Sequence, residues 1–268
     1  MNRLKIRWII FAGLALVIII SYIIRIDLDT KPSPLVQKSY DYIESLPEST
    51  VVMFCFDHEA SSLPEIKPIA LAMLRHAIRK NLKIIGLSTF AEGTAIGYML
   101  MTKTAQEYGR EYGRDYVFLG FRPQHISVFL AMGESISHAF PLDYLGNRVD
   151  TIPMMRAVDN YDDIDMVISI ADGDRTTQWV EYAGARYHQK IMGGITSAMI
   201  TSYDPYLASG QLYSVVGGLV GAAEYEILLG TRAAGNRGIL AQTSAHIYVI
   251  AMIIIGNIVY FRMRKGRG

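Results

Sequence analysis

Near each end of the chain lies a long apolar run without a formal charge, and these two runs determine how much sequence is left for a folded domain. Residues 8–24 read WIIFAGLALVIIISYII, and residues 239–261 read ILAQTSAHIYVIAMIIIGNIVYF, with His246 counted as neutral. A helix that crosses the hydrocarbon core of a bilayer needs roughly 20 apolar residues. The first run has 17 residues and the second has 23, so we expect both to form transmembrane helices.

The first run also has to be compared with a cleavable signal peptide, because the preceding MNRLKIR is a suitable basic region. The exit from the run, ISYIIRIDLDT, contains no cleavage site of the small-x-small kind. The run is also longer than the apolar core of an ordinary signal peptide. We therefore interpret it as a retained anchor.

Basic residues precede the first apolar run and follow the second. Lys and Arg beside a transmembrane helix favour the cytoplasmic side, so the sequence predicts two cytoplasmic termini and an extracytoplasmic domain. The predicted division is a tail and transmembrane helix in 1–25, a linker in 26–39, the domain in 40–238, a second transmembrane helix in 239–261 and a basic tail in 262–268. The flanking basic residues are Arg3, Lys5, Arg7, Arg262, Arg264, Lys265 and Arg267.

The segment between the two runs is acidic. Residues 26–238 contain all 25 Asp and Glu side chains of the chain but only 18 of its 26 Lys and Arg. A nucleic-acid surface needs basic side chains that displace counterions. We therefore expect no nucleic-acid partner; the expected partners are the lipid bilayer and further membrane protein subunits, among them other copies of the chain.

Five short apolar runs recur along this acidic segment. They are VVMFCF (51–56), LKIIGL (82–87), YVFLGF (116–121), MVISIA (166–171) and KIMGGIT (190–196). Continuous rather than alternating hydrophobicity indicates strands buried on both faces, as in a parallel sheet covered by helices. The sequence therefore predicts an α/β fold of three layers, with a mostly parallel, five-stranded, Rossmann-like sheet.

Segments of helical period separate these runs. In EIKPIALAMLRHAIRKN, residues Ile66, Ile69, Met73, Leu74 and Ala77 fall on one apolar stripe. Residues 143–165 are an exception, a polar connection that we expect to be either a flap over a site or an oligomer contact. Further helices are predicted over about 94–108, 124–137, 175–188 and 206–229.

Polar side chains follow the predicted strands at their carboxyl ends, where an open parallel sheet binds its ligands. Asp57, Glu92, Asp172 and Ser197 are the weak candidates for catalysis if the protein is a hydrolase. Asp, Ser and Thr at such places are also ordinary helix N-caps. A catalytic serine needs a positioned base, yet GGITSAM around Ser197 is not a G-x-S-x-G turn, and no histidine follows it before the second apolar run.

Metal and cofactor sites have little support in the sequence. Asp172 and Asp174 are weak candidates for oxygen ligands of a divalent cation, but the following RTTQWVEY adds only Glu181. The single cysteine, Cys55, lies in VVMFCF and is interpreted as a small core residue. We expect no metal and no cofactor.

The glycines in residues 211–230, QLYSVVGGLVGAAEYEILLG, fit either a nucleotide-binding turn or a packing surface. A dinucleotide fingerprint requires G-x-G-x-x-G after a strand and an acidic residue about 20 positions further on. Gly218 and Gly221 give only G-x-x-G, and 20 residues on the chain enters the second apolar run. Gly217 and Gly221 are predicted instead to form a flat helix face that packs against the sheet, a membrane helix or another subunit.

Three polar residues fall on one stripe of the second apolar run. His246 follows Gln242 by four residues, and Asn257 follows after 11 more. Polar side chains in a transmembrane helix usually face protein rather than lipid. The stripe is therefore interpreted as a contact between helices.

The segments PYLASGQL, GGLVGAAEYE and AQTSAHIYVIAMIIIGNIVYF within 205–261, together with FDHEASSLPEIKPIALAMLRHAIRK at 56–80, resemble a family of uncharacterised prokaryotic membrane-anchored proteins. The resemblance implies a membrane anchor and an α/β body. It implies no activity and no functional residue.

The sequence therefore favours a membrane-anchored binding or assembly module that engages a partner protein or a small ligand and is not an enzyme. The alternative is a membrane-bound hydrolase that uses residues at the carboxyl ends of the parallel strands.

Overall fold

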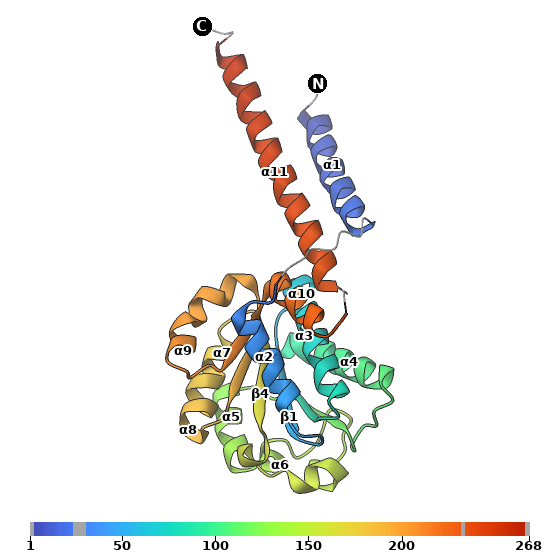
Figure 1. The fold of residues 1–268 in the computed structure, drawn as a ribbon, viewed down its shortest axis with the longest axis vertical. Coiled ribbons are helices and arrows are strands. Elements are labelled where there is room, and N and C mark those ends of the chain that lie inside the picture. The colour runs from blue at the N-terminus through green and yellow to red at the C-terminus, as the bar shows by residue number, and fades with distance from the viewer. Residues whose placement is uncertain (1–2, 24–30, 232–233, 266–268) are drawn as a thin grey trace. The chain divides into compact units, whose positions relative to one another are not determined.

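The computed structural model describes residues 3–23, 31–231 and 234–265. The chain divides into two compact units, one formed by the terminal helices and one formed by Thr30–Gly235. Figure 1 shows strands β1 and β4 inside the second unit, with helices around them. Arg267 and part of the predicted linker, 26–30, lie outside the described residues.

The first unit contains α1 (Arg3–Ile23) and all but the first two residues of α11 (Ala234–Lys265). Within them, Lys5–Ile23 and Arg237–Arg262 are long and apolar enough to cross a membrane. The two helices touch, because the Tyr248 hydroxyl donates a hydrogen bond of 2.9 Å to the carbonyl of Ile10. Gly13 lies under the same ring, where a Cβ would come within 2.3 Å of the Tyr248 hydroxyl oxygen.

The second unit is built on a sheet of six parallel strands in the order β3-β2-β1-β4-β5-β6. The α/β class and the parallel sheet are confirmed, but the predicted number of five strands is wrong. The sixth strand lies inside the segment 206–229 that was predicted as one helix. Its four residues, SVVG, are too few to be assigned to strand or helix by periodicity alone. The strands are β1 (Val51–Asp57), β2 (Lys83–Ser88), β3 (Tyr116–Phe121), β4 (Met166–Ala171), β5 (Ile191–Ile195) and β6 (Ser214–Gly217).

Two helical layers cover the sheet, and side chains alternate between them along each strand. In β1, Phe54 and Phe56 pack into one core, whereas Met53 and Cys55 pack into the other. The first layer contains α2 (Pro34–Ser45), α3 (Leu63–Arg79), α4 (Ala91–Glu107) and α10 (Gly218–Leu228). The second contains α5 (His125–Glu134), α6 (Ile136–Ala139), α7 (Arg175–Gln178), a π-helix (Trp179–Gly184), α8 (Ala185–Tyr187) and α9 (Asp204–Ala208), with 3-10 helices at Val149–Thr151, Pro153–Ala157, Tyr161–Asp163 and Ser197–Tyr203. A further 3-10 turn, Ala60–Ser62, precedes α3.

Helix α2 begins at Pro34, inside the range 26–39 that was predicted as a linker. Its residues Val36 and Ser39 are buried, and the Ser39 hydroxyl donates to the Ser214 hydroxyl of β6 at 2.8 Å. Just before the helix, the amide and the hydroxyl of Ser33 both donate to the carboxylate of Glu224 in α10. The folded domain therefore starts earlier than predicted, and its first helix is hydrogen-bonded to β6 and α10 near its carboxyl end.

The connection 143–165 is not the polar flap that its composition suggests. Seven of its apolar side chains are buried and belong to the core of the second layer. Asp143 supports the first turn, because its carboxylate accepts hydrogen bonds from the amides of Leu145 and Asn147. The segment is therefore an integral part of the second layer and packs against the sheet. The buried residues are Val149, Ile152, Met154, Met155, Val158, Tyr161 and Ile164.

The predicted glycine face does not exist as one helix surface. Gly217 is the last residue of β6, and α10 begins at Gly218. A Cβ at Gly217 would come within 2.6 Å of the side chain of Ile200, whereas a Cβ at Gly221 would meet the backbone of Val216 at 3.2 Å. Both glycines permit close packing, but against different neighbours within the domain.

Candidate functional site

The sheet order reverses between β1 and β4, and the carboxyl ends of these two strands therefore form the switch point at which open α/β sheets bind ligands. Asp57 ends β1, and Asp172 directly follows β4. The sequence-predicted candidates Asp57 and Asp172 thus lie at neighbouring strand ends, since Asp57 pairs with Ala171 in the ladder.

Asp57 is almost completely buried, and its carboxylate is occupied by donors of the protein itself. The amide of Thr89 donates to it at 2.6 Å and the Thr89 hydroxyl at 3.0 Å. The Ser88 hydroxyl lies 3.4 Å away. These bonds hold the loop between β2 and α4 against the end of β1. The role of Asp57 in this structure is therefore structural.

The thiol of Cys55 donates to the same carboxylate, with 2.9 Å between Sγ and Oδ2. Burial raises the pKa of the Cys55 thiol, and the negative charge of Asp57 raises it further. The nucleophilic form of cysteine is the thiolate. Cys55 is therefore held as a neutral core thiol, as its apolar surroundings predicted.

Asp172 and Glu92 both fix the loop that leaves β1. The amide of Glu59 donates to Asp172 at 2.8 Å, and the amide of Ala60 donates to Glu92 at 3.2 Å. Each carboxylate therefore satisfies a backbone N–H group of an exposed loop. The structure brings these two candidates to one loop, as anchors of its backbone.

Ser197 belongs to a separate cluster beyond β5. Its amide and its hydroxyl both donate to Oε1 of Glu65, at 2.6 Å and 2.5 Å. Gly218 lies directly beside it with a φ of +63°, and a Cβ there would come within 1.9 Å of the Ser197 oxygen. Only glycine fits this position. Sequence reasoning missed Glu65 because 132 residues separate it from Ser197 and no local pattern links them.

Asp174 occupies the N-cap position of α7, but its side chain makes no capping bond and instead accepts from Nε2 of Gln178 at 2.9 Å. The predicted metal candidates Asp172 and Asp174 thus have different protein partners. Within the described residues, no group of three His, Cys, Asp or Glu side chains is arranged to hold a metal ion.

Two histidines near the carboxyl ends have a ring nitrogen without a hydrogen-bond partner among the described residues. They are His58, which is fully buried, and His125, at the start of α5. Burial lowers the pKa of His125, and the nearby charge of Arg175 lowers it further. Neither histidine is hydrogen-bonded to Ser197, whose described partner is Glu65, so no serine–histidine pair forms here.

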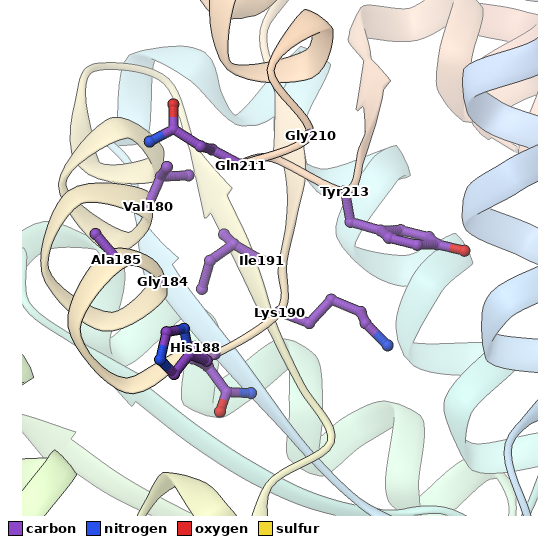
Figure 2. A pocket seen from close by; sticks show the side chains of 10 residues that line it. Val180, Gly184, Ala185, His188, Lys190, Ile191, Gly210, Gln211 and Tyr213 are labelled. Carbon is purple, nitrogen blue, oxygen red and sulfur yellow. The ribbon is translucent and has the colours of Figure 1, made fainter.

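A cavity of about 310 Å³ lies at the opposite edge of the sheet, where β5 and β6 begin. Figure 2 shows Val180 and His188 on the side of the helical coil, Lys190 and Tyr213 on the other side, and Ile191 between them. His188 adopts a left-handed conformation with a φ of +57°, which is uncommon for a residue other than glycine. The volume is at the lower limit of ligand pockets, so the cavity admits only a small molecule.

Lys190, one of the residues that line this cavity, packs against two aromatic rings. Its ammonium lies 4.0 Å from the ring centroid of Tyr42 and 5.5 Å from that of Tyr213. The Tyr42 hydroxyl contacts the same ammonium and donates to Asp165 at 2.6 Å. These contacts fasten α2 to the amino edge of the sheet. No sequence motif predicted them.

The polar residues of the second apolar run lie on α11. Gln242, His246 and Asn257 are all exposed within the described structure, so their predicted role in helix contacts remains a prediction.

No protein-family model matches the chain, and no curated protein or solved structure is significantly similar to it. The family resemblance inferred from residues 56–80 and 205–261 therefore remains an expectation.

Proposed function

We propose that the protein is a membrane-anchored binding or assembly module without enzymatic activity. In this proposal α1 and α11 cross the bilayer, both termini are cytoplasmic, and the α/β domain engages a partner protein or a small ligand on the other side. The length and apolar character of Lys5–Ile23 and Arg237–Arg262 support the anchor. The basic residues at both ends of the chain support the orientation.

The proposal that the protein is not an enzyme is supported by the hydrogen bonds of the carboxylates near the strand ends. Asp57, Asp172 and Glu92 each accept hydrogen bonds from backbone amides of loops. The site of a serine hydrolase needs a nucleophile, a base and a third group that orients the base. Side chains that hold the backbone in place do not form such an arrangement, and they leave the loops rigid for recognition.

Thermal unfolding of Asp57→Asn tests this interpretation. Loss of a buried carboxylate that satisfies the Thr89 amide and hydroxyl should lower the melting temperature clearly, because buried unpaired groups cost about 1–3 kcal/mol each. The exposed Asp162→Asn is the matched control and should leave the melting temperature unchanged. Residues retained for catalysis often cost stability, so a melting temperature of Asp57→Asn that equals or exceeds the wild-type value would contradict the structural role.

One observation favours the hydrolase alternative, namely the bond from the Ser197 hydroxyl to the carboxylate of Glu65. A carboxylate in this position is able to accept the hydroxyl proton. A fluorophosphonate probe, which reacts with activated serines, should not label the purified protein above the level of Ser197→Ala. Labelling that depends on Ser197 and on Glu65 would establish the hydrolase instead.

The orientation is testable because the native chain offers no accessible thiol, since Cys55 is 0% exposed. A cysteine appended to either terminus should be protected from an impermeant maleimide in intact cells. Asp162→Cys, at an exposed site of the domain, should react. The reverse pattern would place the domain in the cytoplasm.

A further inference from the structure

Helix α11 presents two different faces along its length, and α1 occupies only one of them. Ala241 is the most buried residue of the first face, and the Tyr248 hydroxyl bonds to α1 there. The exposed residues Gln242, His246, Val249, Ile253, Gly256 and Tyr260 define a second face, which we call the free seam. Neighbouring positions in a helix differ by about 100°, so the free seam points well away from α1.

The free seam has the spacing of a helix-packing surface. Its six positions follow one another at intervals of 4, 3, 4, 3 and 4 residues, which is the repeat by which two helices interlock side chains. Gly256 has no atom within 4 Å of the place where a Cβ would stand. A second helix can therefore approach the backbone closely at Gly256, where packing between membrane helices is favoured.

The seam also carries polar groups that lipid cannot satisfy. Gln242 and His246 are members of it, and Asn257 borders it next to Gly256. A polar side chain in an apolar medium needs a hydrogen-bond partner. On the described part of α1 the polar side chain at the contact face, Ser21, already donates to its own helix at the carbonyl of Val17. Gln242, His246 and Asn257 are exposed in the described structure, so their side chains are open to a partner outside this pair of helices.

The chemistry of the three side chains selects a second copy of the chain as that partner. Amide side chains and a neutral imidazole each contain both a donor and an acceptor. A stripe of such groups is complementary to itself, whereas a charged stripe would repel its copy. A two-fold axis parallel to α11 brings each of these residues next to its own equivalent, as in a closed symmetric dimer.

We propose that the protein is a parallel homodimer in the membrane, joined through the free seam of α11. This proposal rests on the proposed function only in placing α11 across a bilayer. The α/β domains of the two copies then face the same side of the membrane, which would give the binding module two equivalent surfaces.

Cysteine cross-linking of the full-length protein in native membranes tests the proposal. Val249→Cys and Ile253→Cys lie on the seam, whereas Ile247→Cys and Ile254→Cys lie on an exposed face of α11 away from both the seam and the α1 contact. An oxidant should give a disulfide-linked species of twice 29.9 kDa from the seam pair but not from the control pair. Equal cross-linking of all four, cross-linking of none, or an adduct of another mass would overturn the homodimer.

A substitution that leaves the chain's own packing intact adds an equilibrium measurement. A Cβ at Gly256 would have no neighbour within 4 Å in the described part of the chain, so Gly256→Leu adds its side chain at an open position, yet it blocks close approach of a second helix. It should weaken dimerisation in detergent or nanodiscs about threefold to tenfold, whereas Ile254→Leu should not. Unchanged dimerisation in Gly256→Leu would exclude this seam. Alkaline carbonate extraction of the same membranes separates the two proposals, because a protein that is washed off refutes the anchor, whereas a retained monomer refutes only the dimer.

Discussion

The helices on one face of the sheet are long and regular, whereas those on the other face are short and irregular. In the first layer α3 and α4 have 17 residues each. In the second layer the longest helix, α5, has 10, and much of the remainder is 3-10 or π-helix. Regular helices distribute burial over many similar side chains. Irregular segments, by contrast, need a few large side chains that hold several of them together.

The two layers differ in the side-chain contacts that connect their helices. In the second layer Trp179 is fully buried and its ring centroid lies 3.9 Å from that of Phe129. In the first layer His76 links three helices, because its ring nitrogens lie 2.8 Å from the Tyr225 hydroxyl and 2.9 Å from the Glu44 carboxylate. Stability in the second layer should therefore depend on aromatic volume, and in the first layer on helix packing together with one polar network.

The largest expected effect is that of Trp179→Ala. Removal of this ring leaves a cavity among the π-helix, α5 and the 3-10 segments, and we expect a loss of about 3–5 kcal/mol of unfolding free energy. Leu74→Ala in α3 is the comparison in the first layer. We expect a smaller loss of unfolding free energy there, because the longer helix distributes its buried contacts over many side chains. Denaturant unfolding measures both. A larger loss for Leu74→Ala than for Trp179→Ala would reverse our view of which layer depends on single residues.

A smaller effect is expected from two glycine-to-alanine changes, one in each layer. A Cβ at Gly97 of α4 would lie 2.5 Å from the core ring of Phe56, which cannot move, so Gly97→Ala should cost about 1–3 kcal/mol. A Cβ at Gly133 of α5 would meet the outer end of the half-exposed Tyr187 ring, whose hydroxyl donates to the carbonyl of Leu130 at 2.9 Å. Gly133→Ala should cost less than Gly97→Ala, because this ring can shift toward solvent at the expense of that hydrogen bond and alanine favours the helix. Equal melting temperatures for the two variants would show that both layers tolerate added volume alike.

The smallest expected effect is a pH dependence that comes from His76. Burial lowers the pKa of His76, although the bond to Glu44 opposes this. The unfolded chain therefore takes up a proton before the folded protein does, and stability should fall as the pH drops below about 6.5, by at most about 1.4 kcal/mol per pH unit. Unfolding at pH 7.5 and 5.5 measures the slope.

His76→Gln should remove most of this slope, whereas His125→Gln in the second layer should remove less, because His125 is more exposed. Glu44 has a lowered pKa, mainly through its bond to His76, and its contribution is lost only at still lower pH. A slope unchanged in His76→Gln would mean that other groups cause the dependence.

The regularity of the first layer also explains what could be predicted from the sequence. The stripe of Ile66, Ile69 and Met73 indicated α3 correctly, because a long amphipathic helix repeats its signal several times. The five longer strands were found as continuous apolar runs. Strand β6 was missed, because SVVG is short and runs directly into the apolar helix α10.

In the second layer the sequence did contain a signal, but not one of α-helical period. Val149, Ile152, Met155, Val158, Tyr161 and Ile164 recur every three residues, and all are buried. Three residues per turn is the period of a 3-10 helix, and 3-10 turns form at several places along this segment. Overall polarity hid this pattern and suggested a flap.

For the candidate site, the sequence placed Asp57 and Asp172 at the correct edge of the sheet, since that follows from strand ends alone. It could not show that the carboxylates are occupied by backbone donors, because Thr89 and Glu59 come from other loops. The pairing of Ser197 with Glu65 likewise depends on the tertiary fold and leaves no trace in local spacing.

The attachment of α2 to the last strand has a consequence for the order of events during synthesis. Ser39 and its partner Ser214 of β6 are separated by 175 residues, and a ribosome adds about 5–20 residues per second. Helix α2 therefore waits about 9–35 seconds before β6 exists. During that interval its apolar side is uncovered, and the domain is completed only after β6 and α10 have left the ribosome.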